Sequence, residues 1–198
     1  MGFIRYLIRE LSRIKDLKKY NNFTVAEYFR KQGVQIGEGC MIVPRSMGTE
    51  PYLIKIGNNV AIAQGVKFET HDGGAWIFRK EIPNIQVFGP IIIEDNCVIG
   101  QNAVLFPNIK IGKNSIVGAG SVVISDIPEN TIAMGIPARP FGSVDRYREK
   151  CISRWNEQKP PDCIIEEGCN WWNSKHLKEN REKLKKHLIS LFWKQTAV

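Results

Sequence analysis

A single histidine lies in the middle of the chain, in a setting that suits acid–base chemistry. His71 is followed by Asp72 and begins a segment, residues 71–90, that interrupts a regular repeat. A neutral imidazole titrates close to neutral pH and can accept a proton from an attacking nucleophile. Asp72, Glu69 or a backbone carbonyl could orient the ring. His71 could also be a loop histidine without a functional role, but its place at the start of the longest insertion favours the role of a general base.

The same insertion carries side chains suited to holding a substrate. Trp76, Phe78 and Arg79 follow His71 closely. Small-molecule sites are lined mainly by aromatic and apolar side chains with a few polar groups, so these three residues could form a substrate platform. They could equally be the packing core of the insertion itself.

The cysteines indicate a reducing compartment and no metal site. Five are present, an odd number, at Cys40, Cys97, Cys151, Cys163 and Cys169. Arginines interrupt the apolar N-terminal residues, which breaks the h-region of a secretory signal, so we expect reduced thiols in a cytoplasmic protein. Cys163, Cys169 and His176 match no common zinc module, and we expect no metal.

The elements that must position these residues follow a six-residue repeat. Apolar residues recur at every sixth position of one unbroken block: Ile93, Ile99, Leu105, Ile111, Val117 and Val123. Small or apolar residues follow each of them by four positions: Cys97, Ala103, Ile109, Ser115, Ser121 and Ile127. An earlier block has the same spacing: Ile36 and Ile42, then Ile56, Ile62 and Phe68. Neither a helix nor an alternating strand keeps this period, so we predict a solenoid in which three units close one triangular coil.

The repeat has asparagines at its expected corners and is interrupted by two insertions. Asparagines, which tolerate positive φ, stand at the expected corners: Asn58, Asn59, Asn96, Asn102, Asn108 and Asn114. Two segments break the period, residues 43–55 and residues 71–90, and loops expelled from a solenoid often carry function.

Helices flank the solenoid on both sides. Ile4, Leu7, Leu11 and their neighbours predict an amphipathic helix over residues 3–19. A capping-box pattern at Thr24–Glu27 predicts a second helix, which Gly33 ends. Further helices are expected from Tyr147 to Trp155 and, with a leucine pattern from Leu177 to Leu191, near the C-terminus. The expected domains are therefore 1–33 (helices), 34–142 (solenoid with loop 71–90) and 143–198 (helical tail).

The positive charge is concentrated at the two ends of the chain. The net charge is +8, of which residues 1–32 contribute +5, residues 33–142 contribute −1 and residues 143–198 contribute +4. A nucleic-acid-binding core carries an excess of positive charge, which this core lacks, so we expect no nucleic-acid partner. The basic terminal helices suit an anionic surface, including peripheral contact with a membrane.

The repeats resemble the left-handed parallel β-helix acyltransferases, and in particular the galactoside/maltose and polysaccharide O-acetyltransferases. The resemblance extends from Lys55 to Arg139 and is carried by Ile56–Val60, Thr70–His71, Ile111–Ser115, Val117–Val123, Asp126–Pro128 and Gly135–Arg139. It implies a mainly β fold, a left-handed parallel β-helix of hexapeptide repeats with flanking α-helices. It also implies homotrimers with active sites between neighbouring columns, and His71 as the essential base.

Acetyl-CoA is the donor that the resemblance implies, with no metal. The matching CoA-contact positions are Gln101, Gly118, Ala119, Ile124, Ser125 and Arg139. The family often has a hydroxyl and a lysine where this chain has Ile124 and Ser125, so these two would act through their backbone. A guanidinium at Arg139 suits the CoA phosphates, the alternative being a surface ion pair.

The resulting expectation is an acetyl-CoA-dependent O-acetyltransferase of a sugar or glycan hydroxyl, in cytoplasmic surface-polysaccharide biosynthesis, with contact at the inner membrane face. Three alternatives stay open: N-acetylation of an amino sugar, acetylation of an antibiotic as in streptogramin-type relatives, and a non-catalytic β-helix scaffold. A metal-dependent carbonic anhydrase is rejected, since it needs several histidines and the repeats contain only His71.

Overall fold

The computed structural model describes residues 2–162 and 175–193. The chain divides into two compact units, Met1–Val144 and Asp145–Val198. The first contains all the strands together with the N-terminal helices, and the second contains the C-terminal helices.

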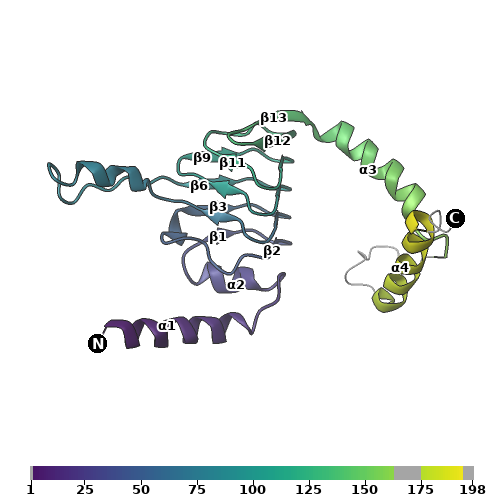
Figure 1. The fold of residues 1–198 in the computed structure, drawn as a ribbon, viewed down its shortest axis with the longest axis horizontal. Coiled ribbons are helices and arrows are strands. Elements are labelled where there is room, and N and C mark those ends of the chain that lie inside the picture. Colours follow the sequence, from purple (N-terminus) through teal and green to yellow (C-terminus); the bar gives the residue numbers. More distant parts are fainter. Residues whose placement is uncertain (1, 163–174, 194–198) are drawn as a thin grey trace. The chain divides into compact units, whose positions relative to one another are not determined.

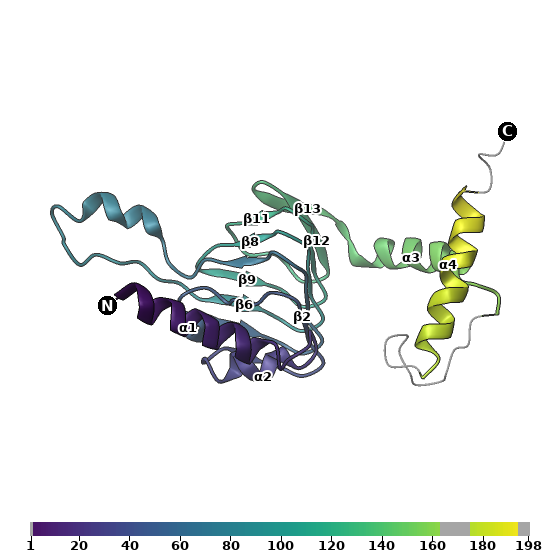
Figure 2. The same ribbon diagram turned by 60° about the horizontal axis from the view of Figure 1, so that its bottom comes forward.

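Three parallel sheets form the sides of a β-helix in the first unit (Figures 1 and 2). Sheet A consists of β1 (Gln35–Ile36), β3 (Ile54–Ile56), β6 (Ile91–Ile93) and β9 (Ile109–Ile111). Sheet B consists of β2 (Met41–Ile42), β4 (Ala61–Ile62), β7 (Val98–Ile99), β10 (Ile116–Val117), β12 (Thr131–Gly135) and β13 (Ala138–Ser143). Sheet C consists of β5 (Lys67–Phe68), β8 (Val104–Leu105) and β11 (Val122–Val123). Only β13 is antiparallel to its neighbour, β12.

The repeat residues predicted from the six-residue spacing form the core. All six residues of the unbroken block are exposed by 1% or less, and the residues four positions after them are exposed by 3% or less. Equivalent residues stack from coil to coil, as Ile62, Ile99 and Val117 do along sheet B. Ser115 and Ser121 are buried but accept hydrogen bonds from backbone N–H groups, which removes the cost of burying a hydroxyl.

The asparagine corners are confirmed with one correction. Positive φ values of 52–59° occur at six asparagines: Asn59, Asn96, Asn102, Asn108, Asn114 and Asn130. Asn58 is not among them, and its side chain instead accepts a hydrogen bond from the Glu38 N–H. Along one corner, Asn59 donates to Asn96 at 2.7 Å and Asn96 donates to Asn114 at 2.9 Å, so the side-chain amides tie successive coils together.

Two helices precede the coils, α1 (Gly2–Leu17) and α2 (Val25–Arg30). The prediction of a capping box at Thr24–Glu27 is wrong. The Asn21 side chain accepts from the Thr24 N–H while the Thr24 hydroxyl accepts from the Asn21 N–H, so the reciprocal pair lies three residues earlier. Gly33, with φ of 94°, follows the end of α2 as expected.

The second unit consists of α3 (Val144–Gln158) and α4 (Leu177–Trp193). Cys163 and Cys169 lie outside the described residues. Within the described residues no helix combines the length and the apolarity needed to cross a bilayer.

Candidate active site

His71 lies at the corner that follows β5, where the long insertion leaves the coil. The two limbs of the insertion pair at this base, since His71 bridges Phe88 in antiparallel fashion and the Asp72 N–H donates to the Val87 carbonyl at 2.9 Å. The Gly89 N–H closes the base by donating to the Thr70 carbonyl at 2.9 Å. Beyond this base the insertion, which contains the 3-10 helix η2 (Gly73–Phe78), projects away from the stacked strands (Figures 1 and 2).

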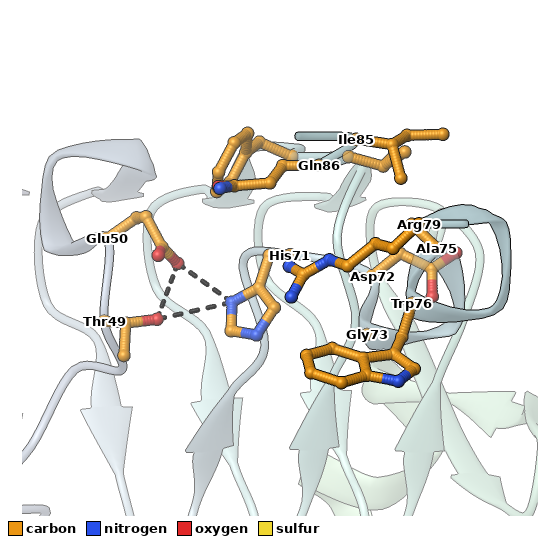
Figure 3. A pocket seen from close by; sticks show the side chains of 12 residues that line it. Thr49, Glu50, His71, Asp72, Gly73, Ala75, Trp76, Arg79, Ile85 and Gln86 are labelled. Atoms are coloured by element: carbon orange, nitrogen blue, oxygen red, sulfur yellow. Dashed lines mark hydrogen bonds and ion pairs between the residues drawn. The ribbon is translucent and has the colours of Figure 1, made fainter. Parts of the chain in front are cut away.

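A glutamate from the preceding coil holds the histidine ring. The Glu50 Oε2 lies 3.1 Å from the His71 Nδ1 (Figure 3). The same oxygen accepts from the Thr70 hydroxyl at 2.6 Å and from the Thr49 hydroxyl at 2.7 Å. The Glu50 side chain is 15% exposed and that of His71 is 42% exposed, so the carboxylate lies behind the ring and the ring faces solvent.

The hydrogen bonds at Glu50 decide where the imidazole proton lies. Burial by itself raises the pKa of Glu50, but hydrogen bonds from Thr70, Thr49 and the imidazole outweigh it and hold this pKa below its usual value. An ionised carboxylate only accepts hydrogen bonds, so the proton of a neutral ring lies on Nδ1. The other ring nitrogen, Nε2, has no hydrogen-bond partner among the described residues and is left to accept a proton.

Asp72 and Glu69, the carboxylates expected to orient His71, do not contact its ring. The Asp72 carboxylate accepts from the Gly74 N–H at 2.8 Å and caps η2. Glu69 participates through its backbone, which donates to the Leu105 carbonyl at 2.8 Å. Adjacency in sequence misled the prediction, because successive residues at a corner point in different directions.

Glu50 comes from the first insertion and was missed by the sequence analysis. It precedes His71 by 21 positions, and equivalent residues of successive coils are separated by 18, as Asn96 and Asn114 are. The signal was therefore present: the first insertion adds two residues to its coil, so that Gln35 pairs with Lys55, and the same register places Glu50 level with Thr70, the residue before His71.

Gly48 permits the chain to bring Glu50 to this position. Its φ is 76°, a left-handed conformation that L residues with side chains rarely adopt. A Cβ at this position would lie 2.5 Å from the Phe68 carbonyl oxygen, in the coil that carries His71. The backbone of the first insertion thus approaches the next coil more closely than any side chain would allow.

The ring of His71 opens into a pocket of about 320 Å³ formed largely by the long insertion. Trp76 and Arg79 line it, and the Arg79 guanidinium lies 4.3 Å from the centre of the Trp76 ring (Figure 3). This arrangement combines an aromatic face, a cation and the histidine in one pocket. Phe78, expected on the same platform, does not line it.

The predicted CoA-binding residues lie along both edges of sheet C. Gln101 and Ala119 occupy the corner between sheets B and C on successive coils, where the Gly120 N–H donates to the Gln101 carbonyl at 2.7 Å. Gly118, at the same corner, donates its N–H to the Ala133 carbonyl at 2.8 Å. Gln101 and Ala119 are both exposed.

Ile124 and Ser125 lie at the corner on the other edge of sheet C, the corner from which His71 emerges. Backbone hydrogen bonds connect this corner through the coils, since the Glu69 N–H donates to the Leu105 carbonyl and the Phe106 N–H donates to the Val123 carbonyl. Both residues are exposed.

Arg139 lies on β13, exposed. It has no ion pair within the described residues, and its guanidinium donates only to the neighbouring Ala138 carbonyl at 3.1 Å. The alternative of a surface ion pair is therefore not realised among residues 2–162 and 175–193.

The buried cysteines are unsuited to nucleophilic chemistry. Cys40 and Cys97 are exposed by 4% and 0% and occupy inward-facing repeat positions, as expected. Burial raises the pKa of both thiols, which disfavours the reactive thiolate. Among the residues that the structure describes, no group of three or more histidine, cysteine, aspartate or glutamate side chains could hold a metal ion.

A β-helix with a carboxylate-bound histidine beside an open pocket is typical of an enzyme, since the histidine and its carboxylate together can deprotonate a nucleophile. Comparison with known proteins agrees. Residues 90–125 match the model of the hexapeptide repeat of succinyl-transferase. The chain is 52% identical to Protein CapG of Staphylococcus aureus over 126 residues, 62% of this chain and 73% of that protein.

Two galactoside acetyltransferases are also similar. The galactoside O-acetyltransferase of Lactococcus lactis is 30% identical over 150 residues, covering 61% of this chain and 71% of the relative. A solved galactoside acetyltransferase in complex with coenzyme A superposes with a TM-score of 0.53 at 25% identity, over 71% of this chain and 82% of the other. The chain belongs to the hexapeptide-repeat acetyltransferase family and is an acetyltransferase.

Proposed function

We propose that this protein transfers the acetyl group of acetyl-CoA to a hydroxyl of a sugar or glycan, in the biosynthesis of a surface polysaccharide. The observation that carries the proposal is the Glu50–His71 pair, whose free ring nitrogen faces a pocket with an aromatic side chain and a cation. The names of the galactoside acetyltransferase relatives support a sugar acceptor, and the coenzyme A complex supports the donor.

The reaction is a direct transfer with His71 as general base. The acceptor hydroxyl attacks the thioester carbonyl carbon while its proton passes to the His71 Nε2. Glu50 keeps the ring in the required tautomer and stabilises the imidazolium that forms. A backbone N–H donates to the oxyanion of the tetrahedral intermediate. When the intermediate collapses, the carbon–sulfur bond breaks and the CoA thiolate takes the proton back from Nε2.

The donor is held along sheet C in this proposal. Gln101, Gly118 and Ala119 on one edge leave backbone and small side chains open to the pantetheine arm, and Ile124 and Ser125 on the other edge contribute their backbone. Ile124 and Ser125 lie at the corner of His71, so a thioester bound at that edge would be within reach of the acceptor. The guanidinium of Arg139, which has no ion pair among the described residues, binds the CoA phosphates.

The protein acts as a homotrimer whose sites lie between subunits. The long insertion exposes several large apolar side chains, among them Trp76 at 68%, Ile77 at 74% and Ile82 at 56%. A cluster of this kind on one projecting loop suits burial against another subunit. In the trimer Phe78 reaches the acceptor or the neighbouring coil, beside Trp76 and Arg79. The free thiols, of which Cys40 and Cys97 are buried, suit a cytoplasmic enzyme.

Release of the CoA thiol tests the proposal. We would follow thiol formation from acetyl-CoA with a panel of glycosides and amino sugars, for the wild type and for His71→Ala. The wild type should release thiol only with a hydroxyl acceptor, and the product should be an ester that hydroxylamine cleaves. An amide product would instead establish N-acetylation. If calorimetry shows no binding of acetyl-CoA, the proposal is wrong and the alternative of a non-catalytic scaffold is favoured.

A further inference from the structure

Helix α1 presents a broad apolar face that stays exposed in the described structure. Five aliphatic side chains at helical spacing are exposed by 42–65%: Ile4, Leu7, Ile8, Leu11 and Ile14. Of the side chains of this helix that the structure describes, only Leu17, at the C-terminal end, is buried in the core, at 7% exposure. Single exposed apolar residues are ordinary, but a contiguous row of this extent marks an interaction surface.

The other face of α1 is polar, and the segment has an excess of positive charge. With 3.6 residues per turn, Arg13 and Asp16 lie opposite the aliphatic row, and Arg5 and Ser12 lie on its flank. The two acidic residues of the helix are already neutralised, Glu10 by Arg13 at 2.8 Å and Asp16 by Lys19 at 2.8 Å. Three cations form no ion pair within the described part of the chain: Arg5 on the flank of the row, and Lys15 and Lys18, which follow Leu11 and Ile14 by four positions and so lie at the C-terminal end of the row.

We propose that α1 binds in the plane of an anionic membrane surface, with its aliphatic row in the acyl boundary and its unpaired cations among the lipid headgroups. A helix with an apolar row, a basic polar face and low overall hydrophobicity has the composition of an interfacial helix. The charge identifies the lipid, because unpaired cations next to a membrane gain free energy only from anionic headgroups.

A second copy of the chain fits this face less well. The helix has 16 residues, which is about two heptads, whereas a coiled-coil seam needs at least about three. The row is also wider than a seam, since Ile8 flanks the positions of Leu7 and Leu11 on one side.

The place of α1 in the fold leaves the aliphatic row free to dock. The helix lies beside α2 at the end of the stack where the coils begin (Figures 1 and 2). It is attached through Leu17 and through Arg13, whose Nη1 donates to the Arg45 carbonyl at 3.0 Å. Because these contacts lie in its C-terminal half, the preceding turns can enter a lipid surface without disturbing the coils. This inference does not depend on the proposed function.

Vesicle flotation of the full chain tests the proposal. Phosphatidylcholine vesicles are compared with vesicles containing about one-third phosphatidylglycerol, at low and at high salt. The wild type should bind the anionic vesicles at least tenfold more strongly, and salt should release it. The Ile8→Glu/Leu11→Glu double variant should lose at least tenfold in binding. Phe141→Glu is the matched control, since Phe141 is 73% exposed on β13, and it should bind as the wild type does.

A second variant separates charge from apolar insertion. Replacing Arg5, Lys15 and Lys18 by glutamine should weaken binding to anionic vesicles by about fivefold per cation. Circular dichroism melting establishes that each variant is folded. The proposal is overturned if the wild type does not bind anionic vesicles, or if the double variant binds like the wild type. If vesicle binding is absent and the double variant changes the mass in light scattering, the row is a contact between copies of the chain.

Discussion

Replacing Glu50 by glutamine removes the charge behind His71 while keeping the shape of the side chain. In the wild type the carboxylate accepts a hydrogen bond from Nδ1 at 3.1 Å, and its side chain is only 15% exposed. A hydrogen bond to a charged group contributes about 1.5–3 kcal/mol, and little solvent is present to screen it. The variant can present its amide N–H₂ to Nδ1, which favours the wrong tautomer.

The loss should therefore be about 10- to 100-fold in kcat, since each 1.4 kcal/mol or so corresponds to a factor of about ten. The KM for acetyl-CoA should stay within about twofold, because the Glu50 carboxylate bonds to Thr49, Thr70 and His71 and to none of the predicted donor-contact residues. Steady-state thiol release at saturating acetyl-CoA measures both constants.

Glu69→Gln is the matched control. Glu69 lies two residues before His71, and its carboxyl forms no hydrogen bond with the ring, so kcat should stay within about twofold of the wild type. Equal losses in Glu69→Gln and Glu50→Gln, or an unchanged kcat in Glu50→Gln, would refute the assignment of Glu50 as the positioning residue.

Four further outcomes follow from the same structure. His71→Ala should lower kcat by about 10²- to 10⁴-fold while calorimetry shows unchanged acetyl-CoA binding; loss of binding would contradict a purely catalytic role. Because the pKa of Glu50 lies below its unfolded value of about 4.3, its stabilisation is present above that pH and is lost as pH falls through the lowered folded pKa, so urea midpoints of the wild type and Glu50→Gln should converge on acidification. Gly48→Ala should reduce both activity and melting temperature, because its Cβ would meet the Phe68 carbonyl oxygen at 2.5 Å; a neutral effect would show that the first insertion adapts freely. Ile99→Ala should lower the free energy of unfolding by about 2–5 kcal/mol in urea titration, since Ile99 is fully buried between coils, and a loss under about 1 kcal/mol would mean that the coils collapse into the cavity.

The unbroken repeat was predictable in detail because each coil uses the same local rule. Every sixth residue faces inward, so burial of Ile93, Ile99 and Val117 could be assigned without knowing how the coils stack. Ser115 and Ser121 are buried at positions that the same six-residue spacing predicts, although a hydroxyl is an unusual core group. The N-cap of α2 was predicted less well, because Asn21 and Thr24 both satisfy capping preferences and only the course of the preceding chain selects between them.

The candidate site was predictable in part. His71 stood out because it interrupts the repeat, and Trp76 and Arg79 line its pocket as the platform hypothesis supposed. The group that orients the ring was not predicted: the candidates were Asp72, Glu69 and a backbone carbonyl, and Asp72 instead caps η2. Sequence analysis considers residues close in sequence as contacts of His71, whereas a solenoid brings residues that are one coil apart into contact.

The amino-acid sequence by itself determined the period of six, the inward-facing core and the two places where loops leave the coils, because these depend on spacing that repeats along the chain. Only the tertiary structure decided which residues of the two insertions meet. The first insertion adds two residues to the 18 of one coil, and the left-handed backbone at Gly48 brings it against Phe68, so that Glu50 lies behind His71. That contact depends on the path of two irregular segments, which no periodic pattern encodes.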